Sequence, residues 1–270
     1  MTYRQFLVFA LAPGVAMLAT LLIARTSAAG EPVAGQVRRA AAVVLGLAVG
    51  AAVYTTPWDG WMIRRSVWWY RPDSVVDTAL RVPVEEYLFM VGMTLLVGCW
   101  TVLVALPPAG GPPEPLAWWR RPVAAAGWLL LAGCGATAAV LSPRALYLGS
   151  ALAWFCPPLA LHSAVGADVL RAVHGLRLRG MALAPLLWVA DGVAIHTGAW
   201  RVGSAHTVGL AVLGLPVEEI VFYFLTSMLI VDTVLLLGHP QVRARLARGL
   251  MRAVQGTHRR VWSPVAPTRS

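Results

Sequence analysis

The heptapeptide Pro-Val-Glu-Glu-Tyr-Leu-Phe at residues 83–89 recurs as Pro-Val-Glu-Glu-Ile-Val-Phe at residues 216–222. The similarity extends upstream of this motif. Four positions match there at identical internal spacing: Asp59-Gly60 with Asp191-Gly192, Ile63 with Ile195, and Trp68 with Trp200. Asp59 precedes Pro83 by 24 positions and Asp191 precedes Pro216 by 25 positions, so the two copies keep register with one insertion. The chain therefore contains an internal repeat.

The composition is that of a protein that crosses a lipid bilayer. Of the 270 residues, 58% are hydrophobic and 13% are charged, and the mean hydropathy is +0.68. These values lie outside the usual range of soluble globular domains. Roughly 20 mostly apolar residues are needed to cross about 30 Å of hydrocarbon, and several stretches of this chain reach that length. We expect an integral membrane protein.

Interruptions of the hydrophobic pattern by Pro, Gly and Arg predict about seven transmembrane helices. The expected spans are 5–24, 39–58, 83–106, 122–141, 145–162, 182–200 and 213–237. The first span is followed by small residues, as in a signal peptide, but only Arg4 precedes it, and we expect a retained helix. The predicted fold class is all-α integral membrane, with two parallel three-helix repeats joined by a connector helix.

The predicted helices divide the chain into four parts. We expect the first three-helix repeat at 1–106, a Pro/Gly-rich linker and the connector helix at 107–144, the second three-helix repeat at 145–238, and a disordered basic tail at 239–270. Corresponding helices lie four crossings apart and so run in the same direction, which predicts a pseudo-twofold axis along the membrane normal. The two glutamate motifs would then face each other at the same depth.

Arginine supplies all the basic side chains other than histidine. There are 22 Arg and no Lys, seven of the Arg lie after residue 240, and the net charge is +10. An Arg-rich segment after a hydrophobic helix is typical of the cytoplasmic side, where it attracts anionic lipid. We expect a multi-pass protein of the cell (inner, cytoplasmic) membrane with a cytoplasmic C-terminus and no nucleic-acid partner. The loop at 59–82 carries four Arg and goes against this orientation.

Two adjacent glutamates stand at the head of a helix in each repeat. Proline and acidic residues in a first turn are also an ordinary helix-start pattern, since the helix dipole favours carboxylates. Ionisable groups near hydrocarbon, however, normally face the bundle interior or a cavity. A protonated carboxylic acid beside an ionised carboxylate can donate one proton and remove another. The candidate catalytic residues are Glu85, Glu86, Glu218 and Glu219, with Asp59 and Asp191 in support.

Neighbouring glutamates on a helix cannot share one task. Their side chains point about 100° apart, so only one of each pair can face a given site. We expect Glu85 and Glu218 to be the equivalent pair in the site, with Glu86 and Glu219 as partners or structural caps.

Aromatic side chains cluster in the sequence around these acids. Trp and Tyr are enriched at bilayer interfaces for anchoring alone. Aromatic faces also attract a cation through the quadrupole of the ring, which would stabilise a carbocation without capturing it. The candidate substrate-binding residues are Trp58, Trp61, Trp68, Tyr87, Phe89, Trp200, Phe222 and Tyr223.

Cysteine and histidine do not indicate a metal site. The three Cys are scattered singly through apolar segments, and the six His are dispersed without the spacing of metal ligands on a helix. The sequence also has no Gly-rich dinucleotide fingerprint. We therefore expect no metal cofactor.

In these motifs the chain resembles the heterodimer-type, flavin-independent lycopene beta-cyclase family, in its fused single-chain form. The resemblance covers roughly residues 3–238 and is strongest at the two Pro-Val-Glu-Glu-x-x-Phe helix starts and at Pro57-Trp58-Asp59 with Trp68 and Tyr70. The second half departs from the pattern, because Val189-Ala190 replaces Pro57-Trp58, which indicates unequal roles for the two halves.

The resemblance implies that the chain is an enzyme, an intramolecular lyase or isomerase of carotenoid biosynthesis. In this reaction a terminal double bond of lycopene, or of a similar linear carotenoid, is protonated. An internal double bond attacks the tertiary cation, and a ring proton is then removed, with no net redox change and no cofactor. The six carboxylic residues become the acid and base candidates by the same resemblance. The implied partners are a polyene or prenyl substrate from the bilayer, membrane lipid, and other enzymes of the carotenoid pathway.

Two alternatives stay open. A carotenoid hydratase or another prenyl or terpenoid cyclase would use the same scaffold, since capture of the cation by water gives an alcohol and loss of a proton gives a ring. A proton-coupled transporter would also use paired repeats with carboxylates. The acids here lie near helix ends, whereas transporters of that kind bind at interrupted helices near the middle of the membrane.

Overall fold

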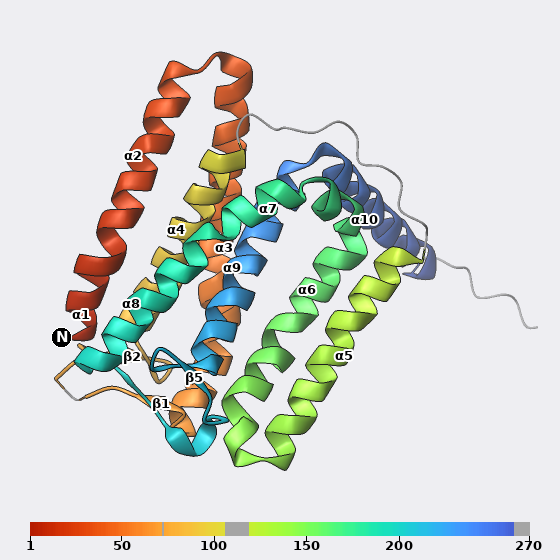
Figure 1. The fold of residues 1–270 in the computed structure, drawn as a ribbon. Helices are drawn as coiled ribbons and strands as arrows, with labels where there is room; N and C mark the ends of the chain where they lie inside the picture. The colour runs from red at the N-terminus through yellow and green to blue at the C-terminus, as the bar shows by residue number, and fades with distance from the viewer. Residues whose placement is uncertain (72, 106–118, 262–270) are drawn as a thin grey trace, which may run out of the picture.

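The computed structural model of the chain is a bundle of long helices closed at one end by short β-hairpins (Figure 1). It describes residues 1–71, 73–105 and 119–261, with side chains up to residue 252. Within this described part, seven helical segments are long and apolar enough to cross a membrane: Tyr3–Ala28, Glu31–Arg64, Val84–Ala105, Arg120–Leu141, Pro143–Ala172, His174–Thr197 and Val217–Gly238. The predicted fold class, an all-α membrane protein with about seven spanning helices, is confirmed.

The two halves of the chain contain corresponding elements in the same order. The first half consists of α1 (Tyr3–Phe6), a π-helical turn (Leu7–Leu11), α2 (Ala12–Ala28), α3 (Glu31–Arg64), β1 (Trp68–Trp69), β2 (Thr78–Ala79), β3 (Val82–Pro83) and α4 (Val84–Ala105). After α5 (Arg120–Leu141), the second half consists of a 3-10 turn (Pro143–Ala145), α6 (Leu146–Ala172), α7 (His174–Gly180), a 3-10 turn (Met181–Leu183), α8 (Ala184–Thr197), β4 (Arg201–Val202), a 3-10 turn (Ser204–His206), β5 (Ala211–Val212), β6 (Leu215–Pro216) and α9 (Val217–Gly238). The elements that surround the glutamate motif thus recur in the same order in both halves.

A tight β-hairpin precedes the glutamate helix in each half. β2 pairs antiparallel with β3, and β5 with β6. The residues of both turns have positive φ, 52° at Leu80, 69° at Arg81, 52° at Leu213 and 84° at Gly214. This is the backbone of the two-residue turn that matches the twist of a hairpin. The hairpins set the point at which α4 and α9 begin.

A third β-pairing joins the two halves. β1 and β4 are antiparallel, with Trp68 opposite Val202 and Trp69 opposite Arg201. Trp69 and Arg201 are 132 positions apart, as are Asp59 and Asp191, so equivalent residues of the repeat face each other directly. An antiparallel pair of equivalent residues is what a twofold relation between the halves produces.

Two helices extend beyond their predicted ends. α3 begins at Glu31 and ends at Arg64, so Asp59 lies within a helix and not in a loop. Residues 163–181, predicted to form a loop, belong to α6, α7 and a 3-10 turn. The hydrophobic pattern stops where Arg residues begin, but a long Arg side chain can pair with a carboxylate and leave the helix intact: Arg177 forms an ion pair of 2.6 Å with Asp232. Of the predicted linker at 107–121, residues 107–118 lie outside the described part of the chain.

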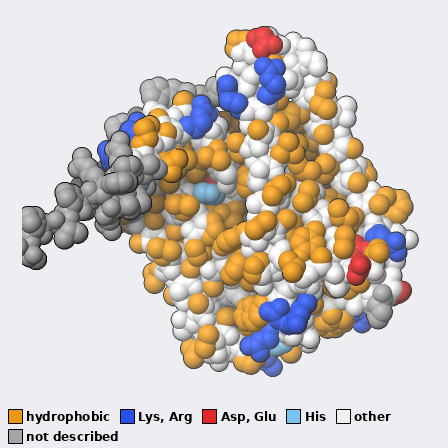
Figure 2. Space-filling view, turned by 180° about the vertical axis from the view of Figure 1, so that it is seen from behind, with side chains coloured by type: hydrophobic (Ala, Val, Ile, Leu, Met, Phe, Trp, Pro, Cys, Tyr) orange, Lys and Arg blue, Asp and Glu red, His pale blue; other side chains and the backbone are white. Residues whose placement is uncertain are grey.

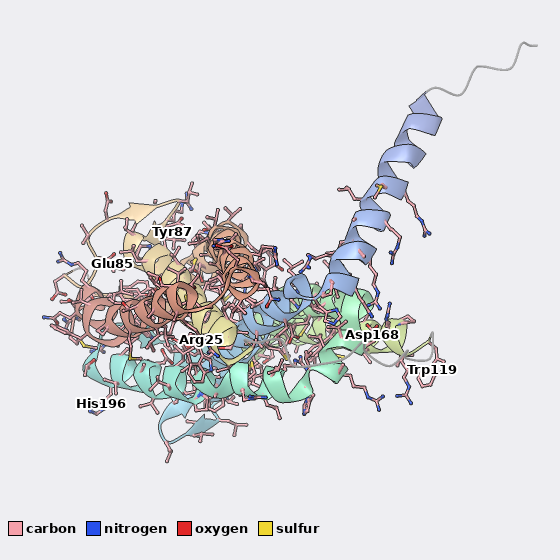
Figure 3. All side chains as sticks on the ribbon, turned by 90° about the horizontal axis from the view of Figure 1, so that it is seen from above. Arg25, Glu85, Tyr87, Trp119, Asp168 and His196 are labelled. Carbon is pink, nitrogen blue, oxygen red and sulfur yellow. The ribbon has the colours of Figure 1, made fainter. Side chains whose placement is uncertain are left out.

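The C-terminal segment forms a helix, α10 (Pro240–Val261), so the expectation of a disordered tail was wrong for these residues. Pro240 stands at the first helical position, where a missing N–H carries no penalty. Val242 is buried, and Arg245 hydrogen bonds to Asp168 of α6 at 2.6 and 2.9 Å. Figure 3 shows α10 leaving the bundle near Asp168 and extending sideways. These contacts stabilise the start of a helix for which hydropathy gives no signal.

The surface and the interior fit a bilayer environment. Hydrophobic side chains cover the middle of the face shown in Figure 2, and Arg side chains gather mainly toward its upper and lower ends. Large apolar residues such as Phe9, Val53 and Leu130 are at least 70% exposed. α5 packs on α6 through Gly135 and Gly149, where a Cβ on Gly149 would lie 2.4 Å from the Gly135 carbonyl oxygen. Small residues permit close helix contact of this kind in membranes.

Candidate active site

A small cavity lies inside the bundle near the hairpin end. Four of the predicted acids reach it from corresponding places in the two halves. Asp59 lies toward the C-terminal end of α3 and Asp191 near the middle of α8, and Glu86 and Glu219 lie in the first turns of α4 and α9. The thirteen lining residues are Tyr3, Trp58, Asp59, Trp68, Tyr70, Glu86, Phe89, Tyr147, Asp191, Trp200, Glu219, Phe222 and Tyr223.

The other two glutamates serve the backbone of their own loops. Glu85 Oε1 accepts a hydrogen bond of 2.9 Å from the Val76 N–H, and Glu218 Oε1 accepts one of 2.7 Å from the Val208 N–H. Both side chains are almost fully buried. The cavity is therefore lined by Glu86 and Glu219, and not by Glu85 and Glu218, the pair that the sequence analysis expected in the site. The 100° separation of neighbouring side chains holds, but the loop N–H groups that need an acceptor decide which glutamate turns away from the cavity.

Tyrosine hydroxyl groups surround the cavity carboxylates. Tyr70 donates a short hydrogen bond to Glu86 Oε1, and the Tyr3 hydroxyl is also in hydrogen-bonding reach of Glu86. Tyr223 donates to Asp191 Oδ1 at 3.3 Å, and Tyr147 is in hydrogen-bonding reach of Glu219. Burial, and then the neighbouring Glu86, raise the pKa of Tyr70 well above its ordinary value, so this hydroxyl remains a donor.

The cavity concentrates acids without a compensating cation. None of the thirteen described residues that line it is Arg, Lys or His. Asp59, Asp191 and Glu219 are each at most 5% exposed. Holding four ionised carboxylates together in such a place costs several kcal/mol per charge, as an order of magnitude. The set therefore keeps protons, which is the condition for one member to act as an acid while another acts as a base.

Aromatic rings from the two halves cross over to form the walls. Trp68 of the first half packs on Tyr147 of the second with ring centroids 5.2 Å apart, and Trp200 of the second half packs on Tyr3 of the first at 5.0 Å. Trp58 stacks on Phe222 at 5.8 Å. Each side of the cavity thus needs residues from both repeats, and neither repeat alone encloses it.

Most of the predicted substrate-binding residues line the cavity, and two do not. Trp58, Trp68, Phe89, Trp200, Phe222 and Tyr223 are in its wall. Trp61 lies under the Arg65 guanidinium, whose carbon is 5.8 Å from the ring centroid. Tyr87 donates to the Ala79 carbonyl oxygen at 3.0 Å, and Figure 3 places it at the edge of the bundle beside Glu85. These contacts hold the Trp61 and Tyr87 side chains outside the cavity.

Three tyrosines of the site were not among the sequence-based candidates. Tyr70 is among the residues that carry the family resemblance and could have been included. Tyr3 and Tyr147 each lie in the first turn of the first helix of their half, 144 positions apart, whereas the repeat offset is 132 or 133. The repeat offset therefore does not relate Tyr3 to Tyr147 in the sequence. In the described part of the chain, no three His, Cys, Asp or Glu side chains are arranged to hold a metal ion.

The lycopene cyclase family model matches residues 10–104 and 144–237, one segment in each half of the chain. The chain belongs to the lycopene cyclase family. Among relatives in this family, it is 37% identical over 235 residues to the lycopene beta-cyclase of Halobacterium salinarum, an alignment that covers 85% of this chain and 92% of the relative.

Fungal members of the lycopene cyclase family match as parts of larger proteins. The chain is 32% identical over 200 residues to the bifunctional lycopene cyclase/phytoene synthase of Neurospora crassa, covering 68% of this chain and 33% of that protein. The corresponding protein of Sporisorium reilianum is 30% identical over 247 residues, covering 86% of this chain and 34% of the relative. No solved structure gave a significant match.

Proposed function

We propose that this chain is a membrane-embedded cyclase that converts the end groups of lycopene, or of a similar linear carotenoid, to rings. The observation that carries the proposal is one cavity lined by four carboxylic residues and nine aromatic residues, with no basic side chain among them, in a member of the lycopene cyclase family. The Halobacterium salinarum relative is a lycopene beta-cyclase, so a β-ring is the first product to test.

The proposed reaction uses the chain's own acids. A protonated carboxyl donates its proton to the terminal double bond, whose electrons form the new C–H bond and leave a tertiary cation. An internal double bond supplies the electrons of the ring-closing C–C bond, and the cation moves into the ring. An ionised carboxylate then removes a ring proton, and the C–H electrons become the ring double bond. One proton enters and one leaves, so the product is an isomer of the substrate.

The aromatic walls support the cationic steps. A cation is attracted to the face of an aromatic ring, and this attraction is strongest where water is excluded. The stacked Trp58 and Phe222, together with Phe89, supply ring surface that is unable to add to the cation as water does. One end of a long polyene would be enclosed by residues of both repeats at this cavity. We propose that the rest of the substrate lies in the bilayer.

The proposed location is a cell membrane, with the C-terminus in the cytoplasm. The segment after residue 240 contains seven Arg and no acidic residue. The C-terminal end of α2, whose last turn contains Arg25, and α10 lie at the same end of the bundle, opposite the hairpins (Figure 1). Because basic residues are enriched on the cytoplasmic side, this end faces the cytoplasm, and the cavity opens near the opposite interface.

Expression in bacteria that accumulate lycopene tests the function, with the extracted pigments separated by chromatography. The proposal expects monocyclic or bicyclic carotenoids with the mass of the substrate, and their loss in the variant Glu219→Gln. Products heavier by one water would show a hydratase. Unchanged lycopene despite insertion of the chain in the membrane would refute the cyclase, and carboxylate-dependent, proton-driven uptake into vesicles would then establish a transporter.

A further inference from the structure

The hydroxyl groups around the cavity break the symmetry of the repeat. The four carboxylic residues are matched between the halves, Asp59 with Asp191 and Glu86 with Glu219. Two tyrosines are not matched. Tyr70 corresponds to Val202 at the offset of 132, and Tyr223 corresponds to Met90 at the offset of 133. Two sets of equivalent acids thus have different hydrogen-bond donors.

Glu86 has the donor arrangement of an ionised group. Tyr70 donates to its Oε1, and the Tyr3 hydroxyl is a second donor within reach. Hydrogen bonds donated to a carboxylate stabilise its charged form, and two of them stabilise it more than one. Glu219, the equivalent residue, has Tyr147 as its one tyrosine neighbour in hydrogen-bonding reach among the described residues. Of the two glutamates, Glu86 is therefore the one better held in the ionised form, in which it is available to accept a proton.

Asp191 has the arrangement of a proton donor. Its Oδ1 accepts the longer bond of 3.3 Å from Tyr223, and Trp200 is also within hydrogen-bonding reach of the carboxyl group. Its Oδ2 is buried and has no hydrogen-bond partner in the described part of the chain. An ionised oxygen without a donor is strongly disfavoured in such a place, whereas a protonated one directs its O–H into the cavity that it lines.

We propose that the two halves divide the reaction, with Asp191 as the acid that protonates the substrate and Glu86 as the base that deprotonates the ring. Tyr70 is the positioning residue that holds Glu86 ionised and fixed in place. This assignment rests on the proposed cyclase function. The proton of the Asp191 carboxyl forms the new C–H bond, and the broken ring C–H bond gives its proton to Glu86 and its electron pair to the ring double bond. Transfer of that proton from Glu86 back to Asp191 within the carboxyl cluster completes the cycle.

The test compares Tyr70→Phe with Tyr223→Phe, each of which removes one hydroxyl from the cavity wall. Tyr70→Phe removes a donor that stabilises the ionised Glu86, so a smaller share of the protein holds the ionised base. The ring cation then lives longer and leaves by other routes, as an alcohol after attack by water or as a ring isomer with a displaced double bond. We expect its ring-forming turnover to fall about 10- to 100-fold, the effect of one hydrogen bond to a charged group. Tyr223→Phe should slow protonation by about 3- to 10-fold, the effect of a neutral hydrogen bond, with only the wild-type product formed.

The product ratio separates a chemical role from a structural one. Damage to the cavity wall alone would give similar products from Tyr70→Phe and Tyr223→Phe, whereas the assignment expects new products from Tyr70→Phe only. Glu86→Gln is the second variant, and it should show the same alcohol or isomer as Tyr70→Phe. An unchanged product ratio in both of these variants, or the new products from Tyr223→Phe instead, overturns the assignment. Failure of the wild-type chain to form any cyclic carotenoid would instead overturn the proposed function.

Discussion

Glu85 and Glu86 are adjacent in one helix turn, and the same substitution at each should have opposite consequences. Glu86 lines the cavity, whereas Glu85 accepts the Val76 N–H at 2.9 Å. Glu86→Gln removes a group that exchanges protons, and positioned acids and bases contribute about 10²- to 10⁴-fold to a rate. We expect the rate of lycopene cyclisation to fall by that factor while the stability of the fold changes little.

Glu85→Gln is the matched control, because the amide keeps a carbonyl oxygen in the place of Oε1. It replaces a hydrogen bond to a charged group with a neutral one and so should lower the free energy of unfolding by about 1 kcal/mol. Its turnover should stay within about threefold of wild type, since about 1 kcal/mol corresponds to roughly a factor of five in an equilibrium constant and leaves most of the protein folded. The same contrast is expected between Glu218→Gln and Glu219→Gln.

The assay follows the disappearance of lycopene in membranes that contain equal amounts of each variant. Thermal unfolding in detergent, monitored by circular dichroism, measures stability in parallel. Loss of turnover in Glu85→Gln with an unchanged melting temperature would refute the assignment of Glu85 to the loop backbone. Full turnover in Glu86→Gln would refute its place in the chemistry.

Two further predictions concern the bundle itself. Arg177→Leu leaves Asp232 buried and without its two hydrogen bonds of 2.6 and 2.8 Å, so the free energy of unfolding should fall by about 3 kcal/mol. The double variant with Asp232→Leu should recover part of the lost stability. Equal melting temperatures for Arg177→Leu and wild type would contradict this prediction. Gly149→Val places a Cβ 2.4 Å from the Gly135 carbonyl oxygen and should lower the free energy of unfolding by about 1–3 kcal/mol or separate α5 from α6. Gly127→Ala is its control, because a Cβ there meets no described atom within 4 Å, and an equal effect of the two changes on thermal unfolding would rule out close packing as the cause.

The sequence by itself was sufficient for the properties that depend on local composition and on self-comparison. Length and hydropathy predicted seven spanning helices, because the bilayer imposes one length requirement on every crossing. The repeated Pro-Val-Glu-Glu motif and the matched Asp59 and Asp191 indicated the acids that line the cavity. Burying a carboxyl group in a membrane protein is costly, so such a group marks a functional site. The aromatic candidates Trp68 and Trp200 followed from the same alignment of the halves.

Only the tertiary structure decided which of two adjacent glutamates faces the cavity. The side chains of Glu85 and Glu86 point in directions about 100° apart around the axis of α4. Glu85 turns away from the cavity because the N–H of Val76, in the loop before the hairpin, needs a hydrogen-bond acceptor. Tyr3 and Tyr147 could not be paired from the sequence, because they come from helix starts outside the register of the repeat and meet the acids only after the halves pack together. The local hydrophobic pattern of the sequence indicates which residues are buried, and the packing of distant segments determines which of the buried residues are in contact.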